Sequence, residues 1–195
     1  MALFGPSVRV KTYRMGWRRG LVVPFLEAAA PVMARLLEER FGQRLEPVEV
    51  TLTVSDGLAE LACRAEQTFV PGLSGRVRSK ALDSARQNAR EASGHVVLRP
   101  GARGTWLLLN AEAEDVSGDD PLGVARVLCH EGVHCVQMGR AGVREARIAY
   151  DRHGYGVELL SSDVVRAYEA LVEEHEREAY GLEDELAGEL LRRMK

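Results

Sequence analysis

The segment that most restricts how this 195-residue chain can fold runs from Pro121 to Met138. Asp119, Asp120 and Pro121 predict the start of a helix, because aspartate caps helices well and proline fits the first helical position. Apolar side chains lie on almost every side of that helix, namely Leu122, Ala125, Leu128, Cys129, Val133, Cys135 and Val136. A helix of this kind is buried nearly all round, so the rest of the fold has to be built around it.

The same helix carries three ionisable side chains, in the sequence His130-Glu131-Gly132-Val133-His134. Residues four apart lie on one helix face, one turn above the other, so both imidazoles can reach one metal ion. Glu131 lies about 100° further round the helix, beside such an ion, where its carboxylate can take a proton from a water molecule. Unpaired and buried, each polar group would cost on the order of a few kcal/mol, and a metal ion removes that cost. H-E-x-x-H is the pattern typical of zinc hydrolases.

A catalytic zinc ion takes three protein ligands and leaves one position open for water. The extended motif, in which a glycine and a third histidine follow, is missing here because Gln137 and Arg140 occupy those places. We therefore expect the third ligand on a helix further along the chain.

The helix predicted over residues 163–182 offers that ligand. At about 100° per residue, its apolar face is centred on Val172, and Glu176 lies about 40° from that centre. Glu173 lies near 100°, at the margin of the face. A glutamate within an apolar face needs a partner, so Glu176 is the expected third ligand and Glu173 the alternative.

These residues resemble a known family. His130-Glu131-x-x-His134 followed by Glu176-Arg177-Glu178-Ala179-Tyr180 is similar to the gluzincin branch of the zincin metallopeptidases. In that branch the third ligand is a glutamate in a Glu-x-x-(Ala/Ser)-Asp type segment of a second helix. Ala179 matches the small residue. Tyr180 stands where many members carry an aspartate that supports a ligand histidine.

The resemblance implies a zincin-like α+β fold, in which a small twisted sheet packs on the active-site helix and on a downstream helix that bears the third ligand. Residues 1–195 would form a single metallopeptidase-like domain. It also implies zinc-dependent hydrolysis of peptide bonds in a peptide or protein substrate. Zn²⁺ held by His130, His134 and Glu176 would activate a water molecule, and Glu131 would act as the general base.

The oxyanion that develops during hydrolysis needs a hydrogen-bond donor besides the metal. His153 and Tyr155 are candidates, because they lie in the glycine-rich segment between the two metal-binding helices. A surface loop that happens to hold aromatic residues is the alternative interpretation. His95 is expected to be an edge-strand histidine, and His175 a core histidine or a partner of a ligand, but neither is expected to bind the metal.

A second hypothesis is a zinc-stabilised binding or regulatory module that keeps the site and cleaves little. A third is nucleic-acid binding through a basic N-terminal arm, residues 1–20, and the arginines of residues 76–90. The net charge of −3 gives no general attraction to a polyanion, so a nucleic-acid partner is not expected. The oligomeric state stays open.

Three cysteines cannot all pair, and Cys129 and Cys135 lie roughly 9 Å apart along one helix. A reducing compartment, the cytoplasm, is therefore expected. Arg18 and Arg19 followed by apolar residues faintly resemble an export signal, but Glu27 interrupts the apolar stretch. No run approaches the roughly 20 apolar residues that a membrane-spanning helix needs.

The residue pattern before the motif predicts one helix and three strands. Apolar residues at helical spacing predict a helix over 24–41. Alternation predicts a half-buried strand over 47–54. Two more strands are expected at 95–98 and 105–109, joined by a tight turn, and the second should be the more buried.

Other stretches are less regular. Residues 58–70 suit either a helix or a strand, and 76–91 suit a loop that leads into a solvated helix. Residues 139–158 are expected to be a loop on the substrate side, with at most one helical turn. After the helix at 163–182, a separate helical piece is expected to reach the end of the chain.

Overall fold

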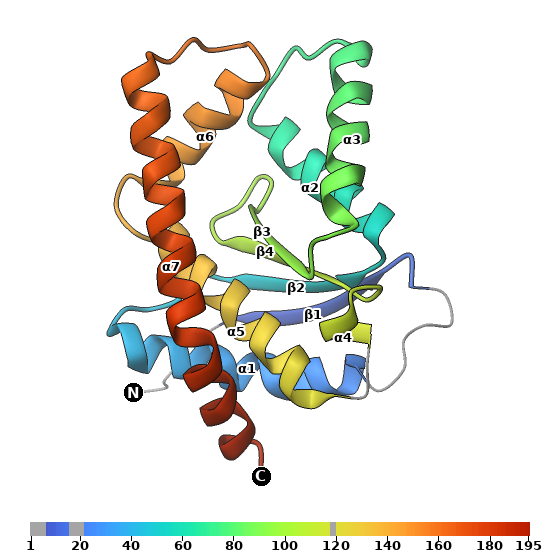
Figure 1. The fold of residues 1–195 in the computed structure, drawn as a ribbon, viewed down its shortest axis with the longest axis vertical. Helices are drawn as coiled ribbons and strands as arrows, with labels where there is room; N and C mark the ends of the chain where they lie inside the picture. Colours follow the sequence, from blue (N-terminus) through green and yellow to red (C-terminus); the bar gives the residue numbers. More distant parts are fainter. Residues whose placement is uncertain (1–6, 16–21, 118–119) are drawn as a thin grey trace.

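The computed structural model describes residues 7–15, 22–117 and 120–195 of the chain. Within these residues, four strands and seven helices form an α+β fold (Figure 1). The strands are β1 (Val8–Tyr13), β2 (Val48–Thr53), β3 (Gly94–Leu98) and β4 (Thr105–Asn110). The helices are α1 (Val22–Phe41), α2 (Ser55–Thr68), α3 (Gly75–Ala89), α4 (Glu114–Ser117), α5 (Pro121–Met138), α6 (Val143–Gly154) and α7 (Ser162–Arg193). The predicted fold class, α+β, is confirmed.

The sheet is mixed, with the strand order β1-β2-β4-β3. β2 pairs in parallel with β1 and with β4, whereas β3 pairs antiparallel with β4. The two strands predicted at 95–98 and 105–109 therefore form a hairpin, as expected, and β4 is the more buried of the two because it lies between β2 and β3. β3 is left as an edge strand.

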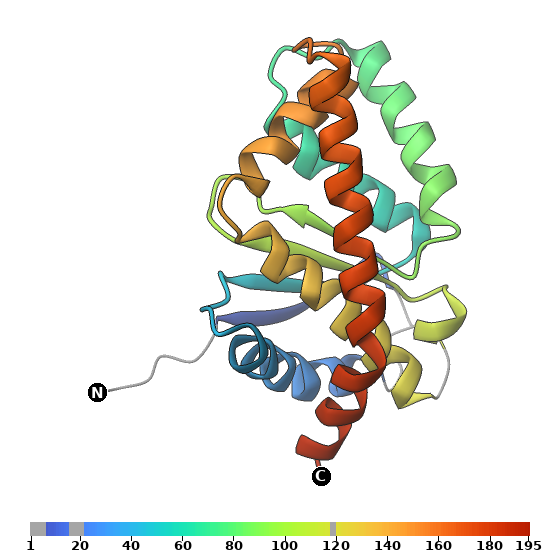
Figure 2. The same ribbon diagram turned by 60° about the vertical axis from the view of Figure 1, so that its left-hand side comes forward.

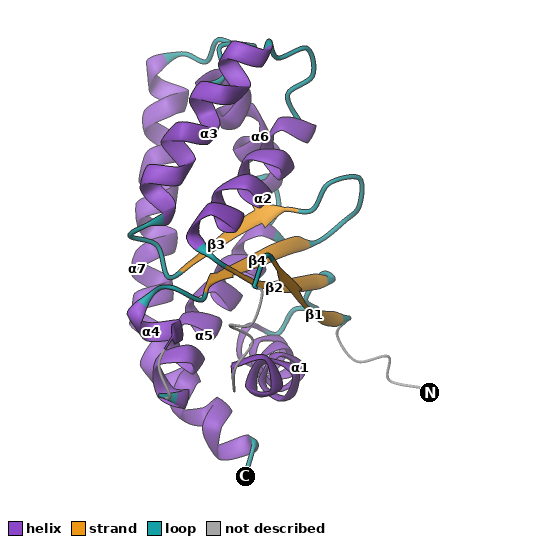
Figure 3. Cartoon of the chain, turned by 90° about the vertical axis from the view of Figure 1, so that its right-hand side faces the viewer, coloured by secondary structure: helices purple, strands orange, loops and turns teal. Residues whose placement is uncertain are grey.

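Helices cover both faces of the sheet (Figure 3). α1 and α5 pack on one face in the larger core, and α2 packs on the other face with α3 against it. This layering explains why all six residues of β2 are buried, although alternation predicted a half-buried strand. That prediction is wrong because a strand between two helical layers has no wet face. Among its polar residues, Glu49 has a partner, since Lys11 Nζ donates to Glu49 Oε2 at 2.8 Å.

α5 is the central helix that the sequence predicted. The Asp120 side chain caps it by accepting hydrogen bonds from the backbone N–H groups of Leu122 and Gly123. Gly132 allows α5 to approach α1 closely, since a β-carbon there would lie 2.7 Å from Met33 Sδ and 2.8 Å from Leu37 Cδ1. Gly132, the middle residue of the His-Glu-Gly-Val-His segment, therefore lies in the contact between α5 and α1.

α7 is one continuous helix of 32 residues, capped by the Ser161 side chain, and not the two helical pieces that the pattern predicted. It runs along the side of the molecule past α6, α5 and α1 (Figures 1 and 2). Its buried residues include Tyr168, His175 and Ala179. Val172, the predicted centre of the buried face, is 39% exposed, because this part of α7 borders a cavity rather than the core.

Three further predictions are corrected by the structure. Residues 143–154 form helix α6 rather than a loop. α3 is helical from Gly75 and nearly all exposed, so the expected leading loop is absent there. Part of the expected N-terminal arm is strand β1, which pairs with β2 from Val8 to Tyr13. Arg18 and Arg19 lie outside the described residues.

Candidate metal centre

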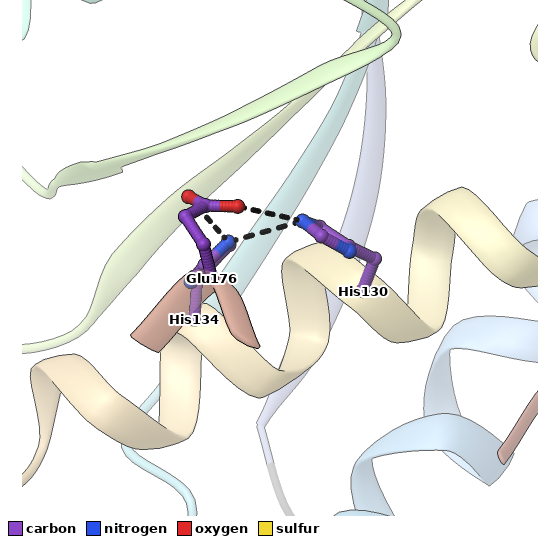
Figure 4. A group of neighbouring side chains, drawn as sticks. All are labelled: His130, His134 and Glu176. Atoms are coloured by element: carbon purple, nitrogen blue, oxygen red, sulfur yellow. Dashed lines mark hydrogen bonds and ion pairs between the residues drawn. The ribbon is translucent and has the colours of Figure 1, made fainter. Parts of the chain in front are cut away.

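His130, His134 and Glu176 converge from two helices (Figure 4). α5 supplies both histidines and α7 supplies the glutamate, so the pairing of these helices assembles the group. The Nε2 atoms of His130 and His134 lie 3.2 Å apart. The Glu176 carboxylate lies 3.5 Å from Nε2 of His130 and 3.3 Å from Nε2 of His134. This group of side chains could bind a metal ion.

The spacing of these atoms fits a metal ion. Three ligand atoms held at roughly 2.0–2.2 Å from a tetrahedral ion lie about 3.3 Å from one another. The separation of 3.2 Å between the two Nε2 atoms matches that spacing. The separations of 3.5 and 3.3 Å join these nitrogens to different oxygens of Glu176, Oε2 and Oε1, so the carboxylate lies at a similar distance from both imidazoles. Glu173, the alternative third ligand, is exposed and is not among the three side chains that converge.

The other nitrogen of each imidazole is held by a partner. Nδ1 of His130 lies 2.9 Å from Glu183 Oε2, and Nδ1 of His134 lies 2.7 Å from Gln137 Oε1. An oxygen acceptor at Nδ1 places the proton there and leaves the Nε2 lone pair free for a metal. Gln137 is fixed in turn, because its amide donates to Glu178 Oε2 at 2.9 Å. Its amide also donates to the backbone carbonyl of His175 at 3.0 Å.

Glu183 takes the supporting position for which the family pattern offered only Tyr180. The Tyr180 ring instead packs edge-on against the His130 ring, with 4.6 Å between the ring centroids. Glu183 is seven residues after Glu176, so helical phase returns it to within about 20° of the same face. That seven-residue spacing is a signal in the sequence, whereas the family pattern points only to the residue four after Glu176.

The charges of the triad are coupled. Hydrogen bonds from His130 and His134 hold the pKa of Glu176 well below its ordinary value. Burial lowers the pKa of each histidine, but hydrogen bonds to Glu176 and the nearby charge of Glu131 outweigh burial, so the pKa of both imidazoles is raised. In the absence of a metal ion, the two imidazoles therefore bind protons more readily than ordinary histidines do. A bound cation would supply the same positive charge.

Glu131 lies beside the triad, and only 7% of its surface is exposed. Burial raises its pKa to about 7, against the opposing charges of His134 and His130. A carboxyl group with such a pKa can exchange a proton near neutral pH. Its side chain packs against the backbone of Gly94, the first residue of β3, where a β-carbon would lie 2.6 Å from Glu131 Cγ.

A cavity of about 540 Å³ opens next to these residues. α5, α7 and the start of β3 form its walls, and Gly94, His95 and Val96 line it along the edge of the sheet. Arg147 of α6 and Tyr168 of α7 also reach it. The triad and Glu131 therefore face a space large enough for part of a ligand.

The structure does not bring His153 and Tyr155 to this cavity. Nδ1 of His153 accepts a hydrogen bond from the backbone N–H of Leu160, within the segment that links α6 to α7. The Tyr155 hydroxyl donates to Glu66 of α2 at 3.3 Å. Both residues belong to the end of α6 and to the turn after it, so their predicted role as oxyanion donors has no support in this geometry.

His95 lines the cavity instead, although the sequence indicated only an edge-strand histidine. Burial and the charges of Arg147 and His134 lower its pKa to about 4, so its imidazole is neutral at pH 7. A neutral imidazole can donate one hydrogen bond. No local pattern could have identified this residue, because its neighbours in the cavity come from α5, α6 and α7.

No protein-family model matches this chain, and comparisons with curated proteins and with solved structures find no match either. None of the described helices is long and apolar enough to cross a membrane. Inferences about function therefore depend on the geometry and chemistry of the site itself.

Proposed function

We propose that this protein is a zinc-dependent peptidase of the zincin type, with a gluzincin-like ligand set. The observation that carries the proposal is the convergence of His130, His134 and Glu176 at ligand spacing, with Glu131 beside them in an accessible cavity. Three ligands leave one position for water, which is the arrangement of catalytic zinc sites; structural zinc sites are closed by four ligands.

The donor types favour zinc over other divalent metals. Two imidazoles and one carboxylate are a common catalytic zinc set, whereas calcium and magnesium prefer oxygen ligands alone. The cysteines are buried, and burial raises the pKa of Cys129 and of Cys135 to about 12. Thiols of this kind stay protonated at neutral pH and are poor metal ligands.

The protein's own residues would do the following in hydrolysis. When bound, the metal polarises the scissile carbonyl and makes water more acidic. Glu131 takes the proton of the attacking water and returns it to the leaving amine. Glu183 and Gln137 keep both imidazoles in the correct tautomer and orientation. His95, facing the same cavity, is positioned to donate a hydrogen bond to an oxygen of the substrate.

The edge of β3 supports a peptide as the substrate. Ser93 accepts from the backbone N–H of Asn110, and the backbone N–H of Arg99 donates to Gly104, so the odd-numbered residues of this strand bond to β4. In an antiparallel ladder the intervening residues direct their N–H and C=O groups outward. Gly94 and Val96 therefore present unpaired backbone groups along the cavity, where an extended peptide can add as a further strand. β4 (Thr105–Asn110) cannot take this role, because it lies inside the sheet.

We also propose a reducing compartment, such as the cytoplasm, for the protein. All three cysteines are free and buried, and free thiols are usual where glutathione keeps proteins reduced. The absence of a membrane-spanning helix among the described residues is compatible with this location.

The test compares the zinc-loaded wild type with Glu131→Gln on a mixture of unstructured peptides, with cleavage followed by mass spectrometry. Glu131→Gln keeps the shape of the side chain and removes its basicity, so peptide cleavage should fall by about 10²–10⁴-fold while zinc content stays the same. Glu174→Gln, on an exposed position of α7, is the matched control. If both variants and the wild type bind zinc and none cleaves a peptide, the zinc-stabilised binding module is the better description.

A further inference from the structure

A second cavity, of about 730 Å³, lies between α2, α3 and α6. It adjoins the metal cavity, since Ala92, His95 and Arg147 line both spaces. The two spaces meet at β3, where His95 stands between them. A ligand that lies along the edge of β3 over the metal site would therefore pass the mouth of this second cavity.

Much of the wall that α2 and α3 form around the second cavity is apolar and made of small side chains. α2 contributes Leu58, Ala59 and Ala62, and α3 contributes Val77, Ala81 and Ala85. Six alanines and two glycines line the cavity, and such short side chains leave space that larger residues would fill. Apolar walls of this kind favour an apolar ligand, because the ligand's apolar surface is removed from water when it binds there.

The charged residues at the α6 end of this cavity satisfy one another. Arg147 pairs with Asp151 at 2.9 Å and with Glu66 at 3.0 Å. Tyr155 donates its hydroxyl hydrogen to the second oxygen of Glu66. Because these groups are already paired, the cavity does not require a charged ligand to neutralise them.

The alternation of side chains along β3 directs a bound peptide toward this cavity. Gly94 and Val96 face α5, since Gly94 contacts Glu131 and Val96 belongs to the larger core. His95 and Val97 face the opposite side, where Val97 packs with residues of α2. In a paired strand, a residue directly opposite His95 has its side chain on the same face as His95. That face opens on the second cavity.

We propose that the second cavity is a specificity pocket, which receives a bulky apolar side chain of the peptide at the position opposite His95. The substrate class is then an extended peptide segment with leucine, phenylalanine or a similar residue at that position. This inference rests on the proposed function for its link to cleavage, but peptide binding tests it independently of cleavage.

The first experiment measures binding to zinc-loaded Glu131→Gln, which should hold a peptide without cleaving it. The probes are short fluorescent peptides that are identical except at one position, which holds leucine, phenylalanine, alanine or glutamate. Fluorescence polarisation should show leucine and phenylalanine peptides binding about 10-fold or more tighter than the alanine peptide, and the glutamate peptide weakest.

The second experiment fills the pocket. Ala81 of α3 is partly exposed and lines the cavity, so Ala81→Trp, introduced into the Glu131→Gln protein, should occupy the space without disturbing the core. The bulky-residue peptides should lose about 10-fold in affinity, while the alanine peptide should bind unchanged. Ala28→Trp, at an exposed site on α1, is the matched control. Ser84→Trp, which also lines the cavity from an exposed position, replaces Ala81→Trp if that variant does not fold.

The outcomes separate this inference from the proposed function. Selective peptide binding that the pocket-filling variants remove supports the pocket, even if the wild type cleaves nothing. Cleavage by the wild type with equal binding of all four peptides overturns the pocket and leaves the peptidase proposal standing. A preference that survives both Ala81→Trp and Ser84→Trp, or no binding of any peptide, also overturns the pocket.

Discussion

Glu131 lies against Gly94 so closely that a β-carbon at position 94 would come within 2.6 Å of its Cγ and 2.7 Å of its Oε1. The residue proposed as general base is on the central helix, and the strand proposed to bind substrate begins at Gly94. This one contact therefore joins the two functional parts of the site, and only glycine fits there without displacing the carboxylate.

The first prediction concerns that contact. Gly94→Ala should shift the Glu131 carboxylate, and a misplaced general base should lower the rate of peptide cleavage by about 10–100-fold. Zinc affinity should stay the same, because Glu131 is not one of the three ligands. Gly75→Ala, where a β-carbon meets nothing within 4 Å, is the control. Full activity of Gly94→Ala would show that the contact has no role in catalysis.

The second prediction concerns Glu183, which holds Nδ1 of His130 at 2.9 Å. Loss of a partner of this kind typically costs about 10–100-fold in metal affinity. Glu183→Gln should therefore lose zinc to a competing chelator at correspondingly lower chelator concentrations than the wild type, with Glu174→Gln unchanged. Equal zinc affinity in the wild type and Glu183→Gln would show that Glu183 does not support metal binding by His130.

The third prediction concerns the packing of α5 on α1. Met33 and Leu37 are fully buried and have little space into which to move, so Gly132→Val should overpack the interface and lower the free energy of unfolding by about 1–3 kcal/mol. Chemical denaturation of the metal-free protein measures this. Gly181→Val, at an exposed helical position with open space, should not destabilise. A stable Gly132→Val protein would mean that the two helices are not in close contact.

The fourth prediction is a pH dependence that comes from His95. Burial and the charge of Arg147 lower its pKa from 6.5 to about 4, so the folded state disfavours the protonated ring. The stabilisation is present above pH 6.5, the unfolded value, and is lost as the pH falls toward 4. Between pH 7 and pH 5, the metal-free wild type should lose about 2 kcal/mol more unfolding free energy than His95→Asn. An equal loss of unfolding free energy between pH 7 and pH 5 in the two proteins would contradict the lowered pKa of His95.

Local patterns in the sequence predicted the helices that carry the three candidate metal ligands. The cap at Asp120, the apolar helix after it and the four-residue spacing of His130 and His134 are local features, and the structure has them. Helical phase also identified Glu176, because a ligand glutamate and the residues that pack around it must share one face of α7.

Long-range contacts were not predictable in this way. Val172 was expected to be buried, but an apolar face can line a cavity as well as a core, and no local pattern separates these cases. β2 was expected to have a solvent-exposed face, but Glu49, Thr51 and Thr53 on that face are buried. His95 reaches the site only through the hairpin of β3 and β4, whose place beside α5 depends on the whole sheet.

The central claim is that His130, His134 and Glu176 hold a zinc ion, and X-ray absorption of the purified protein at the zinc edge tests it most directly. We predict one zinc ion per chain with nitrogen and oxygen ligands at about 2.0–2.2 Å and no sulfur near 2.3 Å, and loss of that zinc in the triple variant His130→Ala, His134→Ala and Glu176→Ala. Purified protein that binds no zinc, or zinc that is bound through sulfur or retained by the triple variant, would contradict the claim.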